Sequence, residues 1–231
     1  MYQVILKLIK MRKAIVLLSG GQDSTTCLYW AKKNFDEVYA IGFDYGQMHK
    51  QELVQAQKIA NDAEVEYKIL NVRGLLAQSS LTEHSNHNEK SKINNELPAS
   101  FTAGRNLLFL TIASSYGASI GVTDIVTGVC QTDYSGYPDC RRNTIDAMQL
   151  SLSLGLGIGD IRIHTPLMYL DKAETWKLAN ELDCLDVIIN DSLTDYNGDL
   201  TKNDWGYGVN NNPATELRVK GFYEAKQKGW I

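Results

Sequence analysis

Long apolar runs, paired cysteines and an excess of basic residues are all missing from this chain of 231 residues. No apolar stretch approaches the roughly 20 residues that a membrane-spanning helix needs. The formal net charge of −4 offers no general attraction for nucleic acid or for an anionic membrane, since both bind basic surfaces. We therefore expect neither a nucleic-acid nor a membrane partner, and an anionic ligand would have to be held by a local site.

The cysteines form no recognisable metal-binding or redox motif. The four are Cys27, Cys130, Cys140 and Cys184, and no two of them stand at the C-x-x-C spacing of zinc and thiol-redox sites. Unpaired thiols are typical of reducing compartments. We expect a cytoplasmic protein with free, half-buried cysteines.

Short β-branched apolar runs alternate with amphipathic segments along the chain. The pattern predicts strands at 13–18, 37–45 and 65–72 and helices at 24–34 and 51–62. This order implies a parallel sheet with helices on both faces. Further along, strands are predicted at 124–129 and 161–167, and helices at 105–121, 142–155, 172–182 and 214–227.

These elements predict an α/β fold in a single domain, residues 1–231. We expect a Rossmann-like, doubly wound, parallel five-stranded sheet in the order 3-2-1-4-5, formed by a core at 12–190 and followed by a small helical C-terminal extension at 191–231. Residues 1–10 are interpreted as an extension that could add an edge strand. The polar stretch 77–100 is long for a loop in a compact domain, which favours a functional segment such as a lid.

The stretch LLSGGQDSTT at 17–26 follows the first predicted strand and opens the first predicted helix. Its glycines let the backbone approach a ligand closely, and the amides of a helix N-terminus favour an anion such as phosphate. Asp23 would tolerate phosphate only through a divalent cation, which makes it a candidate Mg²⁺ ligand. The candidate nucleotide-binding residues are Leu18, Ser19, Gly20, Gly21, Gln22, Asp23, Ser24, Thr25 and Thr26.

Two commoner phosphate motifs do not fit this stretch. No lysine follows the glycines as in G-x-x-x-x-G-K-[ST], and the G-x-G-x-x-G spacing is absent. The alternative is an ordinary tight turn between strand and helix, which the S-G-G-x-D-S pattern at the end of the first strand disfavours.

The stretch TGVCQTDYSGYPDCRRNTIDAMQ at 127–149 follows the fourth predicted strand. In the expected strand order the first and fourth strands are neighbours, so their C-terminal loops share one ligand-binding crevice. Tyrosines there can stack on a heterocycle, carboxylates can accept hydrogen bonds from its N–H groups, and arginines can pair with a carboxylate. The residues alone equally allow a solvated turn. The candidate substrate-binding residues are Asp133, Tyr134, Tyr137, Asp139, Arg141 and Arg142.

The string SGGQDS (19–24) resembles the SGGxDS loop of the N-type ATP pyrophosphatases, the PP-loop superfamily, whose members split ATP into AMP and pyrophosphate. Further strings resemble the 7-cyano-7-deazaguanine synthase family: DYGQ-H (44–49), GRNLLFL (104–110), TDYSGYPDCR (132–141), DAMQ (146–149), TPL (165–167) and KAETW (172–176). The match runs in order over residues 12 to 228 and implies an adenine nucleotide alpha hydrolase-like fold.

The resemblance also implies a reaction. The substrate would be 7-carboxy-7-deazaguanine: ATP adenylates its carboxylate, ammonia displaces AMP to give an amide, and a second ATP converts the amide into the nitrile. ATP and Mg²⁺ would be the cofactors, and the assembly would be a homodimer. Asp23 would act with Mg²⁺, while Lys172 and Arg105 are the catalytic candidates for neutralising developing negative charge. For these two cations, a surface ion pair or a helix-end position is the alternative.

The C-terminal extension departs from the family. Members carry four cysteines there that bind a structural zinc, whereas this chain has Asp195 at the first position, Tyr207 and Thr215 near two others, and no Cys or His in the region. Tetrahedral structural zinc needs four good nitrogen or sulfur donors. We therefore expect no zinc site, and packing of aromatic side chains in its place: Trp205, Tyr207, Phe222 and Tyr223.

Smaller departures leave the final product open. Met48 stands where the family has arginine, and Thr102 and Ala103 stand where it has Val-Pro. The leading interpretation is an ATP-dependent ligase that forms 7-cyano-7-deazaguanine. The alternatives are a variant that stops at 7-amido-7-deazaguanine, a degenerate nucleotide-binding regulatory protein, which the intact SGGQDS loop disfavours, and a tRNA-thiolating enzyme, which the net charge and the TDYSGYPDC string disfavour.

Overall fold

The computed structural model describes residues 11–48, 50–76, 79–82, 90–91, 95–132 and 136–231. The N-terminal extension at 1–10, with its expected edge strand, and parts of the expected lid at 77–100 lie outside the described residues. In the part that is described, no helix is both long and apolar enough to cross a membrane.

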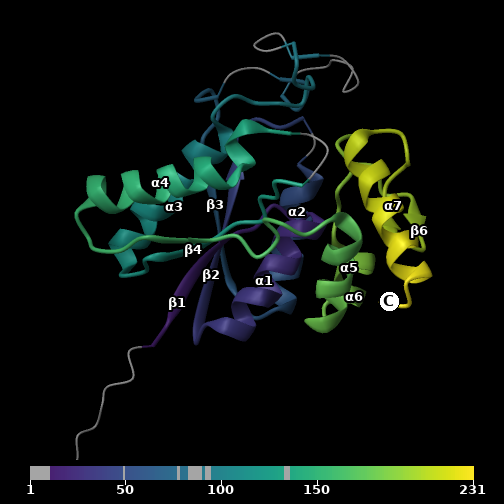
Figure 1. Ribbon diagram of the computed structural model, residues 1–231, viewed down its shortest axis with the longest axis horizontal. Coiled ribbons are helices and arrows are strands. Elements are labelled where there is room, and N and C mark those ends of the chain that lie inside the picture. The colour runs from purple at the N-terminus through teal and green to yellow at the C-terminus, as the bar shows by residue number, and fades with distance from the viewer. Residues whose placement is uncertain (1–10, 49, 77–78, 83–89, 92–94, 133–135) are drawn as a thin grey trace, which may run out of the picture.

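A five-stranded parallel sheet forms the centre of the molecule (Figure 1). Its strands are β1 (Lys13–Leu17), β2 (Glu37–Asp44), β3 (Glu66–Asn71), β4 (Asp124–Val126) and β5 (Arg162–His164). They are hydrogen-bonded in the order β3-β2-β1-β4-β5, and every neighbouring pair is parallel. The predicted order is therefore confirmed, and β1 and β4 lie side by side.

Helices cover both faces of the sheet, as the alternating pattern predicts. They are α1 (Gln22–Asn34), α2 (Gln51–Asp62), α3 (Arg105–Ile120), α4 (Arg142–Leu156) and α5 (Lys172–Glu181). Figure 1 shows α3 and α4 on one face of the sheet and α1 and α2 on the other. Helix α5 begins with the predicted capping box, in which Asp171 and Glu174 accept hydrogen bonds from each other's backbone N–H groups.

The two faces of the sheet belong to separate hydrophobic clusters because successive side chains of a strand point to opposite sides. Val16 packs with Leu28 of α1 and Ile59 of α2 on one side. Its neighbour Ile15 packs with Leu110 of α3 and Ile145 of α4 on the other. The core thereby fixes which loops meet at the C-terminal ends of the strands.

The chain after α5 contains elements that the sequence did not predict. These are α6 (Leu185–Asp191) and a small antiparallel pair formed by β6 (Lys202–Asn203) and β7 (Gly206–Tyr207). Helix α7 (Pro213–Gln227) closes the chain and packs against α5, where Trp176 and Phe222 share a third buried cluster.

Candidate active site

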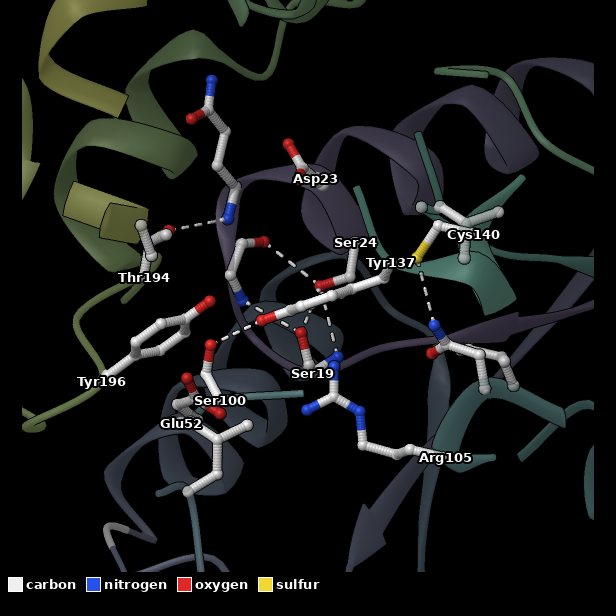
Figure 2. Close-up of a pocket in the computed structure, with 18 of the residues that line it drawn as sticks. Ser19, Asp23, Ser24, Glu52, Ser100, Arg105, Tyr137, Cys140, Thr194 and Tyr196 are labelled. Atoms are coloured by element: carbon white, nitrogen blue, oxygen red, sulfur yellow. Dashed lines mark hydrogen bonds between the residues drawn. The ribbon is translucent and has the colours of Figure 1, made fainter. Parts of the chain in front are cut away.

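A cavity of about 550 Å³ opens where the loops after β1, β2 and β4 meet (Figure 2). The SGGQDS loop forms one wall, and the segment that follows β4 forms another. The two are in direct contact, since a Cβ on Gly128 would lie 3.1 Å from the backbone carbon of Asp23. The structure thus brings the two loops together as the strand order predicts.

The SGGQDS loop forms hydrogen bonds between its own hydroxyl and backbone groups (Figure 2). The Ser24 hydroxyl accepts from the Ser19 amide at 3.2 Å and donates to the Gly21 carbonyl at 3.1 Å. Gly20 has φ +88°, and a Cβ there would lie 2.4 Å from the carbonyl oxygen of Glu52. Glycine is therefore required at this position both by its conformation and by the close approach of α2.

The predicted nucleotide-binding residues divide into two groups. The cavity is lined by Leu18, Ser19, Gly21, Gln22, Asp23 and Ser24. Gly20, Thr25 and Thr26 lie behind it: both threonines are fully buried, and their hydroxyls donate to the carbonyls of Gly21 and Gln22 at 2.8 and 2.9 Å. The structure therefore places these two hydroxyls in the first turn of α1, where they support the loop.

Asp23 is paired with Lys172, the first residue of α5. The ammonium nitrogen lies 3.0 and 2.9 Å from the two carboxylate oxygens, with both side chains partly buried. The pairing brings a cation and an anion of the predicted catalytic set to one point on the cavity wall. It also gives Asp23 a counter-ion within the chain.

The residues at this wall fit magnesium only together with a bound polyphosphate. Across the described ranges, no group of three or more His, Cys, Asp or Glu side chains could hold a metal ion. Magnesium is, however, commonly held by one or two carboxylates while phosphate oxygens and water complete its shell. Asp23 can supply one such carboxylate.

Arg105 lies among tyrosines on the opposite side of the cavity. Its guanidinium carbon is 5.8 Å from the ring centre of Tyr45. Burial lowers the pKa of Arg105, but its neighbours Tyr45, Tyr137 and Tyr196 more than offset this and hold the pKa above its ordinary value. Arg105 is thus a permanent cation on the cavity wall.

Of the predicted substrate-binding residues, the structure places Tyr137 in the cavity. Its hydroxyl lies 2.6 Å from that of Ser100, and its ring centre lies 5.6 Å from that of Phe101 (Figure 2). Asp133 and Tyr134 fall outside the described residues. Their predicted roles stay predictions.

The remaining predicted substrate-binding residues do not line the cavity. Asp139 is buried and accepts a hydrogen bond from the Asn106 amide at 3.1 Å, so it caps the N-terminus of α3. Arg142 donates to Thr165 at 2.9 Å and pairs with Asp146 at 2.5 Å. Together with Arg141 it lines a separate shallow depression. The sequence predicts substrate binding by these arginines because a guanidinium can pair with a carboxylate, but it does not show that both side chains lie outside the cavity.

Glu52 is the most informative residue that sequence reasoning missed. It lines the cavity from the first turn of α2, and its carboxyl makes no hydrogen bond to any residue that the structure describes. Burial raises the pKa of Glu52 to about 7, against the opposing charge of Arg105 and with a contribution from Asp195. A signal was available: Glu52 stands four and seven residues before Ala56 and Ile59, on the buried stripe of the helix.

The C-terminal extension also reaches the cavity, through Thr194, Asp195 and Tyr196. Burial raises the pKa of Tyr196 well above its ordinary value, and the neighbouring Tyr137 adds to this effect. No motif in the 191–231 segment pointed to this contact. It arises because the Leu193 amide donates to the Gly20 carbonyl at 2.9 Å and ties the extension to the SGGQDS loop.

The positions expected for zinc cysteines form a hydrogen-bonded cluster. Asp195 accepts from the amides of Asn197 and Val209 at 2.7 and 2.9 Å, and the Thr215 hydroxyl donates to the Val209 carbonyl at 2.9 Å. The expected aromatic packing is only partly present. Trp205 and Phe222 are buried, but Tyr207 is half-buried and Tyr223 is 50% exposed.

The smaller departures from the family lie outside the cavity. The Met48 amide donates to the Leu81 carbonyl at 3.0 Å, and the buried Thr102 hydroxyl donates to Ser79 at 2.7 Å. Neither residue, nor Ala103, lines the cavity. Their placement gives no reason to expect a different ligand.

The sequence matches the model of the family described as queuosine biosynthesis protein QueC over residues 13–226. It is 48% identical over 211 residues to a 7-cyano-7-deazaguanine synthase of Phocaeicola vulgatus, covering 90% of this chain and 92% of that protein. It is 46% identical over 217 residues to one of Bacteroides fragilis, covering 93% and 96%. Among solved structures, NMN synthetase from Francisella tularensis is similar with a TM-score of 0.49, 14% identity and coverage of 95% and 87%.

Proposed function

The chain belongs to the family of the queuosine biosynthesis protein QueC, and from that membership we propose that it converts 7-carboxy-7-deazaguanine, ammonia and ATP into 7-cyano-7-deazaguanine. The curated relatives are 7-cyano-7-deazaguanine synthases, and this chain is an ATP-dependent ligase of the same type. The observation that carries the proposal is the single cavity in which the SGGQDS loop meets Tyr137 and Arg105.

The polyphosphate of ATP would lie on the SGGQDS loop. The N-terminus of α1, a favourable place for an anion, lies on the cavity wall, and the Ser19 hydroxyl adds a donor. Bound magnesium would neutralise part of the phosphate charge, with Asp23 as its ligand from this chain. Lys172 would then face both the carboxylate of Asp23 and the phosphate oxygens, and its charge would stabilise the departing pyrophosphate.

The substrate would occupy the aromatic part of the same cavity. Tyr45, Phe109 and Tyr137 supply ring surfaces for a flat heterocycle. Arg105 lies among them and can pair with the substrate carboxylate before its activation. This arrangement would hold the carboxylate near the α-phosphate of ATP, and such positioning is a large part of catalysis in reactions of two bound substrates.

Glu52 is suited to prepare the ammonia nucleophile. Ammonium must lose a proton before its nitrogen can attack the acyl adenylate. A free carboxylate with a pKa near neutrality is an efficient proton acceptor at that pH. In the proposed step, the proton passes from ammonium to Glu52, the C–N bond forms, and the C–O bond to AMP breaks with its electron pair leaving on the phosphate. The second excess proton on nitrogen passes to water.

The product test is incubation of the protein with 7-carboxy-7-deazaguanine, ATP, Mg²⁺ and ammonium, followed by mass spectrometry. We expect the nitrile and AMP. Asp23→Asn should lower AMP formation at least about 100-fold, since it removes a charged group at the reacting phosphates. Asp186→Asn, at an exposed position of α6, serves as the matched control.

Each other outcome identifies an alternative. Accumulation of the amide alone would mean that the chain stops at 7-amido-7-deazaguanine. Absence of AMP with every component present would favour a nucleotide-binding regulatory protein. Full activity of Asp23→Asn would contradict the assigned role of this carboxylate.

We further propose that the protein works in the cytoplasm as a homodimer, which the family resemblance implies. An exposed apolar stripe on α4, formed by Leu150 and Leu154 at 62% and 75% exposure, supports an assembly through this helix. Native mass spectrometry should give twice the chain mass of 25.8 kDa. A monomer mass at micromolar concentration would contradict it.

A further inference from the structure

Arg218 of α7 is a fully buried cation with an unusual set of partners. It is 0% exposed, and its guanidinium donates to four neutral oxygens. These are the carbonyls of Trp205 and Ile188 at 3.1 and 2.8 Å and the hydroxyls of Ser192 and Thr194 at 3.0 and 2.9 Å. It forms no ion pair with any residue in the described ranges. Its charge is therefore hydrogen-bonded but not neutralised.

Burying a charge without a counter-ion costs free energy, and this cost lowers the pKa of a buried cation. Burial lowers the pKa of Arg218 to about 9, and the carboxylate of Asp23 is the anion that acts against this shift. Asp23 lies on the SGGQDS loop. Arg218 therefore interacts electrostatically with the wall where the polyphosphate is proposed to bind.

Thr194 connects this cation to the loop. Its hydroxyl oxygen accepts from Arg218 at 2.9 Å and from the Gln22 amide at 3.3 Å (Figure 2). A hydroxyl has two lone pairs and one proton, so both acceptor positions are in use. The proton donates to no residue that the structure describes, and Thr194 lines the cavity beside Gly21. This O–H is available to a ligand.

We propose that Thr194 and Arg218 form a polyphosphate-binding pair contributed by the C-terminal extension. Thr194 donates its hydroxyl proton to a phosphate oxygen of the nucleotide, and the buried charge of Arg218 strengthens that hydrogen bond from behind. Arg218 is a positioning residue, since it acts through Thr194. The proposal rests on the use of ATP in the proposed function, but not on the identity of the acid.

The test measures binding of inorganic pyrophosphate in the presence of Mg²⁺ by isothermal titration calorimetry. Thr194→Val removes the hydroxyl at nearly constant volume and should weaken binding about 10- to 100-fold, the usual range for a hydrogen bond to a charged group. Thr194→Ser keeps the hydroxyl and should bind within about threefold of the unchanged protein. Thr201→Val, exposed and outside the cavity, is the control.

Arg218→Lys tests the cation itself. A lysine retains the charge but not the fork of donors, so affinity should fall between that of Thr194→Val and that of the unchanged protein. If Arg218→Lys does not fold, the comparison of Thr194→Val with Thr194→Ser still tests the proposal. Melting curves are recorded without pyrophosphate. Similar melting temperatures for Thr194→Val and Thr194→Ser would show that weaker binding does not come from a loss of structure.

The outcomes separate this inference from the proposed function. Binding of Thr194→Val within twofold of the unchanged protein would overturn the pair alone. Failure of the unchanged protein to bind pyrophosphate would overturn the pair and the proposed use of ATP together. Loss of binding in Thr194→Val would support the pair even if 7-carboxy-7-deazaguanine proved not to be the acid.

Discussion

At the scale of single residues, the surroundings of a charged side chain indicate its role in the cavity more clearly than its position in a sequence motif. Asp23, Lys172 and Arg105 were chosen from sequence as the reacting set, and all three line one cavity. Sequence could not show that Asp23 and Lys172 pair with each other, because 149 residues separate them along the chain. In this pair the positive charge of Lys172 is neutralised by Asp23. A bound polyphosphate would compete with Asp23 for the lysine.

Burial of Glu52 makes the stability of the fold depend on pH. Its pKa is raised from 4.5 to about 7, so between these values the folded chain holds a proton that the unfolded chain has lost. Stability contributed by the neutral carboxyl is therefore complete below pH 4.5 and is lost as the pH rises toward 7. Glu52→Gln should melt a few degrees higher than the unchanged protein at pH 8, which corresponds to roughly 1 kcal/mol, and at a similar temperature at pH 4.5.

Thermal melting at the two pH values checks this, with the exposed Glu66→Gln as control. Equal shifts of Glu52→Gln at both pH values would show that the carboxyl is not buried as a neutral group.

The same variant tests the proposed proton transfer. It should still form the adenylate but should make amide at least about tenfold more slowly, the low end for loss of a general base.

At the scale of single elements, local sequence signals predict turns, helix caps and amphipathic helices, but they do not predict how these elements contact one another. The SGGQDS loop, the capping box of α5 and the helix at 51–62 were found because glycines, a D-x-x-E pattern and helical spacing are local features. The strand predicted at 124–129 is observed only over Asp124–Val126, and the residues that follow form the loop that carries Gly128 against Asp23. Helix α6 and the β6–β7 pair are too short to give a periodic pattern.

The C-terminal extension shows how one set of residues replaces another. The hydrogen bonds of Asp195, Asn212 and Thr215 close the segment 195–215 in place of the thiolates that the family resemblance led us to expect. Thr215 is fully buried and Asp195 nearly so, so these bonds are shielded from water. We propose that this cluster, supported by Trp205 and Phe222, holds the extension without zinc.

Metal content tests that proposal. The native mass spectrum of the purified protein should show no zinc, and a chelator should leave its melting temperature unchanged. Asp195→Ala should lower stability by about 1–3 kcal/mol, because it leaves two backbone amides without an acceptor. One tightly held zinc per chain, or unfolding by the chelator, would contradict the prediction.

At the scale of the whole molecule, the strand order determines where function can lie. The alternation of strands and helices predicts a parallel sheet, and the order 3-2-1-4-5 belongs to the fold that the family resemblance implies; the structure confirms this order, which brings the loops after β1 and β4 into one crevice. The contribution of residues 193–196 to the same cavity was not predictable. It depends on long-range contacts such as the bond from the Leu193 amide to the Gly20 carbonyl, for which the sequence contains no local pattern.

We propose that this cavity brings ATP and a carboxylate substrate together so that the acid attacks the α-phosphate. The most direct test uses 7-carboxy-7-deazaguanine labelled with ¹⁸O in its carboxylate, with mass analysis of the AMP released. Adenylation transfers one carboxylate oxygen to the phosphate, so we expect AMP that carries one ¹⁸O. Release of unlabelled AMP while the amide forms would contradict it.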